Sequence, residues 1–187
     1  MSNDDIQKAL ATFNWQSVIN LIPNLQTLND EQWRFIKGYI IELATEYSSN
    51  KELSYVGEHH RDFIWKILNL DVELKTFTSG TFYKKNGKLR KSFPFKLTNS
   101  NGTNNKNELT EDLICDIVIF IAQDGVAFVD KQTVIKNLKK NGDGFSLTVM
   151  NNDLIEVTGK MNVTEKKQID FKKVIQDAIT NELKKFF

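Results

Sequence analysis

The feature that most constrains the fold is an almost entirely apolar run at residues 113–122, LICDIVIFIA, which is rich in β-branched side chains. A run of this composition, without polar alternation, is typical of a β-strand that is buried on both faces. Such a strand needs other elements packed against both sides of its sheet. Asp116 interrupts the run, and a carboxylate there must be hydrogen-bonded or lie at an open end of the strand.

The rest of the chain predicts an α/β (α+β) class, with helices flanking a mixed central β-sheet. The predicted helices are residues 3–13, 14–22, 30–48, 132–140 and 165–185, and further strands are predicted at residues 126–129, 145–150 and 154–158. We expect a single domain over residues 1–187, because this length suits one hydrophobic core. Its helical N-terminal part covers about 1–50, and its sheet with the C-terminal helix covers about 51–187.

Capping signals mark the helices of the N-terminal part. We expect Asn3 and Asn14 to cap the first two helices, and Pro23 to end the second. Asn29, followed three residues later by Gln32, predicts a capping box at the start of the third helix. Apolar residues of the third helix recur at intervals of three and four and predict one wide buried face. These residues are Phe35, Ile36, Tyr39, Ile40, Leu43, Ala44 and Tyr47.

Composition and charge narrow the function classes. The chain is 40% hydrophobic and 26% charged, with a formal net charge of +1, as in an ordinary globular protein. This balance excludes a surface that is basic all round, so any DNA affinity needs a local patch or a partner. The N-terminus lacks the pattern of a signal peptide, and the single cysteine, Cys115, is expected to be a buried thiol. We therefore expect a cytoplasmic protein.

A second strand carries the residues with the clearest chemistry. Apolar Val72 and Leu74 alternate with charged Asp71, Glu73 and Lys75, a period of two that predicts charged side chains on one strand face. Glu73 and Lys75 would then point the same way. Similar acid-x-lysine triplets occur in the C-terminal segment, but helical periodicity there turns such side chains about 200° apart.

A further acid, Asp62, lies eleven residues before Glu73. Two carboxylates beside an ammonium suit metal-dependent cleavage of a phosphodiester, because carboxylate oxygens hold Mg²⁺ and the metal lowers the pKa of bound water. Lysine adds a fixed positive charge for the phosphate oxygens or orients the attacking water. A tight hairpin turn at residues 69–70 would place Asp62 opposite Phe77, too far from Glu73 to share an ion. The turn therefore comes earlier, the segment before it is irregular, or another acid supplies the ligand.

Asp62 together with the segment VELKT at residues 72–76 resembles the PD-(D/E)xK nuclease superfamily, which includes most dimeric restriction endonucleases. The resemblance implies a restriction-endonuclease-like fold. It also implies that Asp62, Glu73 and the backbone carbonyl of Leu74 hold Mg²⁺, while Lys75 orients or activates water. Cleavage would leave a 5′-phosphate and a 3′-hydroxyl.

The resemblance leaves the remaining ligands open. Arg61 stands where the proline of the motif would be. Glu58 and Asp71 are alternatives for the first acid. Several members of the superfamily use a glutamate from the helix before the catalytic hairpin, and here that residue would be Glu46 or Glu42.

Cations follow the predicted strand, around an Asn-Gly pair at residues 86–87 that favours a hairpin turn. They could belong to a solvated hairpin edge, but their place after the predicted site favours contact with DNA phosphates. His59 and His60 are expected in a loop near the DNA rather than as metal ligands, and the role of an asparagine-rich stretch at residues 99–107 is left open. The expected phosphate-binding residues are Lys84, Lys85, Lys88, Arg90 and Lys91.

No segment of the sequence resembles a dedicated DNA-recognition module. Together with the small size and the order of elements, this resembles the small catalytic subunit of a heterodimeric type IIS restriction endonuclease. The resemblance implies double-stranded DNA as substrate and a larger partner that recognises the site and nicks the other strand. The alternatives are a homodimeric restriction endonuclease that reads its own site, and a non-catalytic DNA- or partner-binding protein in which Glu73 and Lys75 form only an ion pair.

Overall fold

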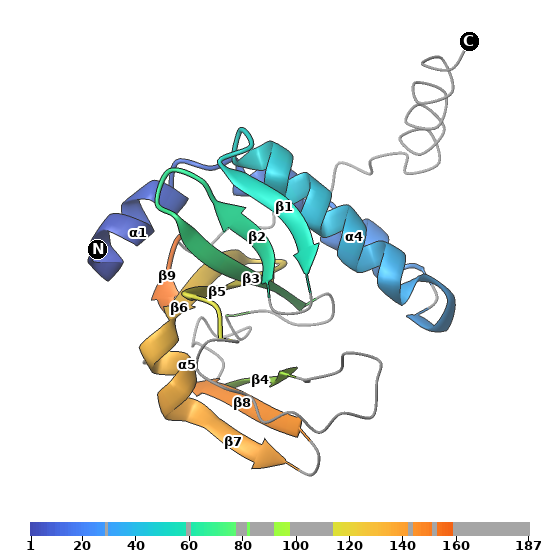
Figure 1. The fold of residues 1–187 in the computed structure, drawn as a ribbon. Helices are drawn as coiled ribbons and strands as arrows, with labels where there is room; N and C mark the ends of the chain where they lie inside the picture. The colour runs from blue at the N-terminus through green and yellow to red at the C-terminus, as the bar shows by residue number, and fades with distance from the viewer. Residues whose placement is uncertain are drawn as a thin grey trace.

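The computed structural model describes residues 1–28, 30–58, 61–77, 82, 92–97, 114–141, 144–150 and 153–158. The predicted features outside these residues include the cap at Asn29, the turn at 86–87, the asparagine-rich stretch at 99–107 and the helix at 165–185. Within the described part, helices pack against a mixed β-sheet, which confirms the predicted fold class (Figure 1). No described helix is long and apolar enough to cross a membrane.

The main sheet has six strands in the order β1-β2-β3-β5-β6-β9. Only the β3–β5 pair is parallel among these ladders, and the other neighbours run antiparallel. The strands are β1 (Leu53–Glu58), β2 (Arg61–Trp65), β3 (Leu70–Phe77), β5 (Ile117–Ala122), β6 (Gly125–Asp130) and β9 (Ile155–Glu156). The strand β1 was not predicted, and β9 is shorter than the segment 154–158.

The central strand β5 is buried on both faces, as its composition predicts. Ile117, Ile119 and Ile121 belong to a core shared with the N-terminal helices, while Val118 and Phe120 belong to a second core on the opposite face. The strand begins at Ile117 rather than at residue 113. The carboxylate of Asp116, just before it, accepts a hydrogen bond from the backbone N–H of Asp71 at 2.8 Å, so this acid is paired at the strand's end.

The caps of the N-terminal helices agree with the prediction only in part. Asn14 is the N-cap residue of the second helix, as predicted, but its side chain makes no capping hydrogen bond. The helix α1 (Asn3–Leu10) is capped by Ser2 rather than Asn3, because Ser2 and Asp5 form a reciprocal capping box. The second helix, α2 (Trp15–Ile19), ends before residue 22. Pro23 does not stop it but lies in the first turn of α3 (Ile22–Leu25), where its missing N–H costs no helical hydrogen bond.

The long helix α4 (Asp30–Ser48) has the predicted extent, but its buried face is rotated from the predicted one. Ile36, Tyr39 and Tyr47 are exposed, whereas Ile41 and Thr45 are fully buried. Thr45 can be buried because its hydroxyl donates to the carbonyl of Ile41 at 2.8 Å, which satisfies the polar group within the helix. The helix contacts β1 and β3 and lies over that side of the sheet (Figure 1).

A second, three-stranded antiparallel sheet has the order β4-β8-β7. Its strands are β4 (Ser92–Leu97), β7 (Leu138–Asn141) and β8 (Gly144–Met150). The helix α5 (Lys131–Asn137) contacts both β6 and β8 and so joins the two sheets (Figure 1). This helix was predicted to reach residue 140, but the backbone becomes extended at Leu138 and pairs with β8 instead.

Candidate active site at the end of the β2–β3 hairpin

The register of the β2–β3 hairpin places Asp62 beside Glu73. Phe63 pairs with Val72 and Trp65 pairs with Leu70, so extending the ladder by one residue sets Asp62 across from Glu73. The chain turns at residues 66–69, earlier than the tight turn considered from the sequence. Asn69 ends this turn with a φ of 53°, a left-handed conformation that asparagine adopts more readily than most residues.

The side chain of Asp62 is fixed by the neighbouring strand. Its Oδ2 accepts a hydrogen bond from the backbone N–H of Leu74 at 2.7 Å. Within the described part of the chain, Oδ1 has no such partner. The carboxylate therefore bridges β2 and β3 at the point where their pairing ends. Its Oδ1 stays available to bind a ligand.

Glu73 and Lys75 lie on the same face of β3 and form an ion pair, as the period of two predicts. Their side chains are mostly buried, with exposed fractions of 12% for Glu73 and 27% for Lys75. Burial alone lowers the pKa of Lys75, but Glu73 and Asp62 raise it more, so this ammonium stays charged. The pair thus differs from a surface ion pair, which solvent would screen.

Burial and the charge of Glu73 raise the pKa of Asp62 to about 7. The N–H of Leu74 and the charge of Lys75 oppose this rise without cancelling it. Asp62, Glu73 and Lys75 thus lie together in a partly buried space. With Glu73 ionised, a negative charge on Asp62 as well is unfavourable there. An acid whose pKa is strongly raised, next to a charged neighbour, is typical of functional sites.

A third acid, Glu42 on α4, faces the same cluster. Burial raises the pKa of Glu42, the hydroxyl of Tyr55 lowers it by donating a hydrogen bond, and Glu73 raises it further. Glu46, one turn along α4, points to a different partner, because its Oε1 accepts the backbone N–H of Tyr55 at 3.2 Å. Of the two candidates on this helix, the structure therefore brings Glu42 to the cluster.

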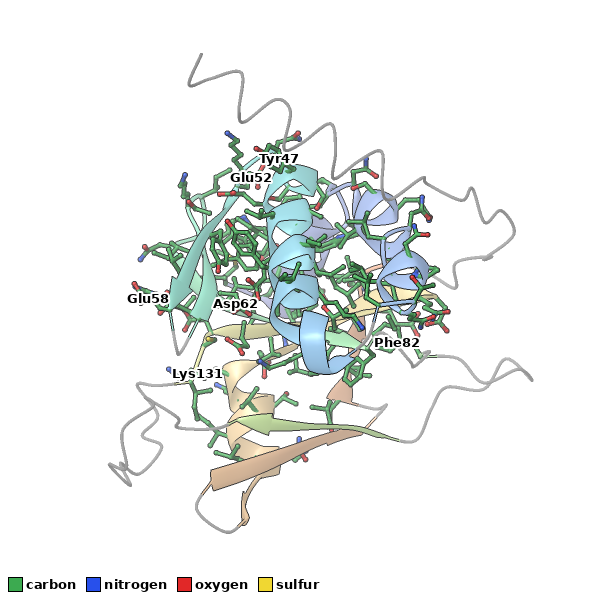
Figure 2. All side chains as sticks on the ribbon, turned by 90° about the vertical axis from the view of Figure 1, so that its right-hand side faces the viewer. Tyr47, Glu52, Glu58, Asp62, Phe82 and Lys131 are labelled. Carbon is green, nitrogen blue, oxygen red and sulfur yellow. The ribbon has the colours of Figure 1, made fainter. Side chains whose placement is uncertain are left out.

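The two alternatives to Asp62 are bound to Arg61. Its Nε lies 3.0 Å from Oε2 of Glu58 and its Nη1 lies 2.6 Å from Oδ1 of Asp71. In Figure 2, Glu58 lies at the outer side of the strands and Asp62 lies between the strand ends and α4. Arg61, in the position of the motif's proline, thus pairs with both alternative acids and leaves Asp62 as the acid beside Glu73.

Two residues near the cluster were not assigned to it from the sequence. Tyr55 lies on β1, and without a prediction of that strand its nearness to Glu42 had no sequence signal. Cys115 is buried as expected, and burial together with Glu73 and Asp71 raises the pKa of its thiol. A thiol with a raised pKa is a poor nucleophile at neutral pH, which supports a structural role.

The predicted DNA-contacting residues are outside the described part of the chain. His59 and His60 fall in the gap between β1 and β2. The predicted phosphate-binding cations also lie outside it: Lys84, Lys85, Lys88, Arg90 and Lys91.

The donor set of the cluster suits a hard divalent cation. Asp62 and Glu73 present carboxylate oxygens, the ligand type that Mg²⁺ prefers. Among the described residues no group of three or more His, Cys, Asp or Glu side chains is arranged as a complete metal site. This is compatible with Mg²⁺, which retains several waters and commonly takes only one or two carboxylates from a protein. A cation between the two acids would also offset the repulsion by Glu73 that, after burial, raises the pKa of Asp62.

No protein-family model matches the chain, and no significant match is found among curated proteins or solved structures. The resemblance based on Asp62 and the segment 72–76 therefore stays an expectation. The chemistry of the cluster carries the functional inference.

Proposed function

We propose that this protein is a Mg²⁺-dependent endonuclease that cleaves one strand of double-stranded DNA, a subunit of a type II (type IIS) restriction enzyme. One observation carries the proposal: a carboxylate, Asp62, is held beside the buried Glu73–Lys75 ion pair at the end of a hairpin. The resemblance of these residues to the PD-(D/E)xK nuclease superfamily points to the same chemistry. The substrate, the partner and a cytoplasmic location are parts of this proposal.

Each residue of the cluster has a role that its geometry supports. Asp62 and Glu73 would hold Mg²⁺, with the carbonyl of Leu74 as a further ligand. Bound there, the cation would lower the pKa of a water and neutralise charge on the phosphate. Lys75, kept protonated by the acids around it, would orient the attacking water or contact a phosphate oxygen. Glu42 would complete the ring of acids around the cation's waters.

The electrostatics favour this role over a purely structural ion pair. A purely structural pair does not need a third ionisable group whose own ionisation is unfavourable in that place. Here burial and the nearness of Glu73 raise the pKa of Asp62 to about 7, although a neutral side chain could accept the same N–H of Leu74. An arrangement that is unfavourable in the free protein is expected where a bound cation restores the balance.

Sequence specificity would come from a larger partner subunit. The near-neutral net charge supports this part of the proposal, because a protein that binds DNA alone usually has a strong basic surface. One such site cuts one strand. A double-strand break would therefore need the partner's own nicking activity, with the two subunits forming a heterodimer on DNA.

The test is cleavage of a mixed-sequence supercoiled plasmid in Mg²⁺ by the protein alone and with the product of its neighbouring gene. We expect site-specific double-strand cuts only with the partner. Glu73→Ala or Lys75→Ala should reduce these cuts to single-strand nicks. Specific cutting by the protein alone would favour a homodimeric enzyme. Partner-dependent cutting that neither substitution affects would leave a non-catalytic binding protein.

A further inference from the structure

Tyr55 connects α4 to the candidate active site through two separate contacts. Its backbone N–H donates to Oε1 of Glu46 at 3.2 Å. Its side-chain hydroxyl faces the carboxylate of Glu42, which lies one helical turn before Glu46, and lowers the pKa of that carboxylate. Tyr55 thus meets two glutamates of the helix: Glu46 binds its backbone N–H, and its hydroxyl acts on Glu42.

Aromatic neighbours restrict the ring of Tyr55. Its centroid lies 5.9 Å from that of Phe63, its partner across the β1–β2 ladder, and 5.7 Å from that of Tyr39 on α4. Both rings meet it edge to face, a favourable arrangement for aromatic pairs. The position of the hydroxyl is therefore fixed by the packing of its ring.

Gly57 provides the space that the hydroxyl occupies. A Cβ atom at this position would lie 2.6 Å from the hydroxyl oxygen of Tyr55, closer than real Cβ contacts. Gly57 also has a φ of 61°, and the β1–β2 register shifts between Tyr55 and Glu58. A glycine in the left-handed region at this irregularity allows the strand to bend around the tyrosine's tip.

We propose that Tyr55 is a positioning residue of the active site, which holds the Glu42 carboxylate toward the Asp62–Glu73 pair, with Gly57 providing the room for its hydroxyl. The inference rests on the proposed function, since its effect is on cation binding. Tyr55 does not itself touch the cation or the substrate. Loss of its hydroxyl should therefore weaken binding of Mg²⁺ while leaving the reaction possible at high Mg²⁺.

The experiment measures Mg²⁺ binding by calorimetry and single-turnover cleavage, with the partner present, across a range of Mg²⁺ concentrations. Tyr55→Phe keeps the ring and removes only the hydroxyl. We expect a several-fold higher Mg²⁺ concentration for half-maximal binding and cleavage, with a nearly unchanged rate at saturating Mg²⁺. Tyr39→Phe, which removes the hydroxyl of the adjacent ring, is the matched control and should behave like wild type.

A double-substitution cycle separates positioning from general loosening of the fold. If Tyr55 acts through Glu42, Tyr55→Phe should add nothing to the effect of Glu42→Gln. Additive effects, or a Tyr55→Phe protein that binds Mg²⁺ like wild type, would overturn the inference.

The failure of this inference can be told from the failure of the proposed function. If Asp62→Asn and Glu73→Gln abolish Mg²⁺ binding but Tyr55→Phe leaves it unchanged, only the positioning role fails. If neither of the first two substitutions alters Mg²⁺ binding or cleavage, the proposed metal site itself fails.

Discussion

Oδ2 of Asp62 accepts the backbone N–H of Leu74 at 2.7 Å, where the β2–β3 ladder ends. Through this contact Asp62 binds to the strand that carries Glu73 and Lys75, although Asp62 precedes Glu73 by eleven residues in the chain. It joins a side chain to a backbone group. The placement of Asp62 therefore follows from the hairpin and does not depend on a bound cation.

Removing a charged group of the cluster should abolish cleavage without unfolding the protein. We expect Asp62→Asn, Glu73→Gln and Lys75→Ala each to lower the single-turnover rate at least about 100-fold, as is typical when one preorganised charged or hydrogen-bonding group is lost. Lys66→Ala is the control, because Lys66 is an exposed lysine in the turn of the same hairpin. Circular dichroism checks the fold, and a Lys75→Ala protein of wild-type activity would contradict the assignment.

The alternative acids should be dispensable. Glu58→Gln and Asp71→Asn are expected to retain cleavage within a few-fold of wild type, because Arg61 binds both carboxylates in the folded protein. The comparison is made under the conditions used for Asp62→Asn, which changes the same functional group. Loss of cleavage in Asp71→Asn with activity kept in Asp62→Asn would reverse the assignment of the first acid.

Stability should depend on pH through Asp62. Its pKa is about 7 in the folded protein against an ordinary value of 3.8, so between these pH values the folded state keeps a proton that the unfolded chain has released. The free energy of unfolding should therefore fall as pH rises through this window, by up to about 1.4 kcal/mol per pH unit. This slope is measured by urea unfolding at several pH values, in the presence of a metal chelator, for the wild type and for Asp62→Asn. A slope unchanged by the substitution would contradict the raised pKa.

Mg²⁺ should stabilise the folded protein through the same residues. A ligand that binds only the folded state adds about 2.7 kcal/mol to the free energy of unfolding at a concentration of one hundred times its Kd. We expect thermal unfolding at neutral pH to shift upward with Mg²⁺ in wild type and in Glu58→Gln. Asp62→Asn and Glu73→Gln should show no shift, and an equal shift in all four proteins would place the cation elsewhere.

An isoleucine-to-alanine substitution at two positions of α4 tests which face of the helix is buried. Ile41 is 1% exposed and Ile36 is 43% exposed. Ile41→Ala should lower the free energy of unfolding by about 2–5 kcal/mol, because it leaves a cavity in the core. Ile36→Ala should cost about 1 kcal/mol or less. A larger loss in Ile36→Ala than in Ile41→Ala, measured by denaturant unfolding, would mean that the helix packs through the face predicted from its apolar residues.

The buried face predicted for α4 was wrong in part, because Ile40 and Ala44 pack against the core but Ile36, Tyr39 and Tyr47 do not, and the reason is physical. Periodicity counts apolar residues and ignores hydroxyls that are satisfied within the helix. Thr45 and Ser48 donate to helical carbonyls, which makes their burial tolerable, and Ile36 and Tyr39 are left exposed. Which face meets the sheet is decided by packing against β1 and β3, and a one-dimensional pattern does not contain that information.

The sequence by itself determined the features that depend on local composition. The run at 117–122 required a strand buried on both faces, and alternation along β3 put Glu73 and Lys75 on one face, because side chains in a strand alternate strictly. Only the tertiary structure decided which acid joins them. The turn at 66–69 sets the hairpin register, Arg61 binds Glu58 and Asp71, and α4 brings Glu42 toward the cluster. These contacts join segments far apart in the chain, and their geometry depends on how the whole sheet pairs and packs.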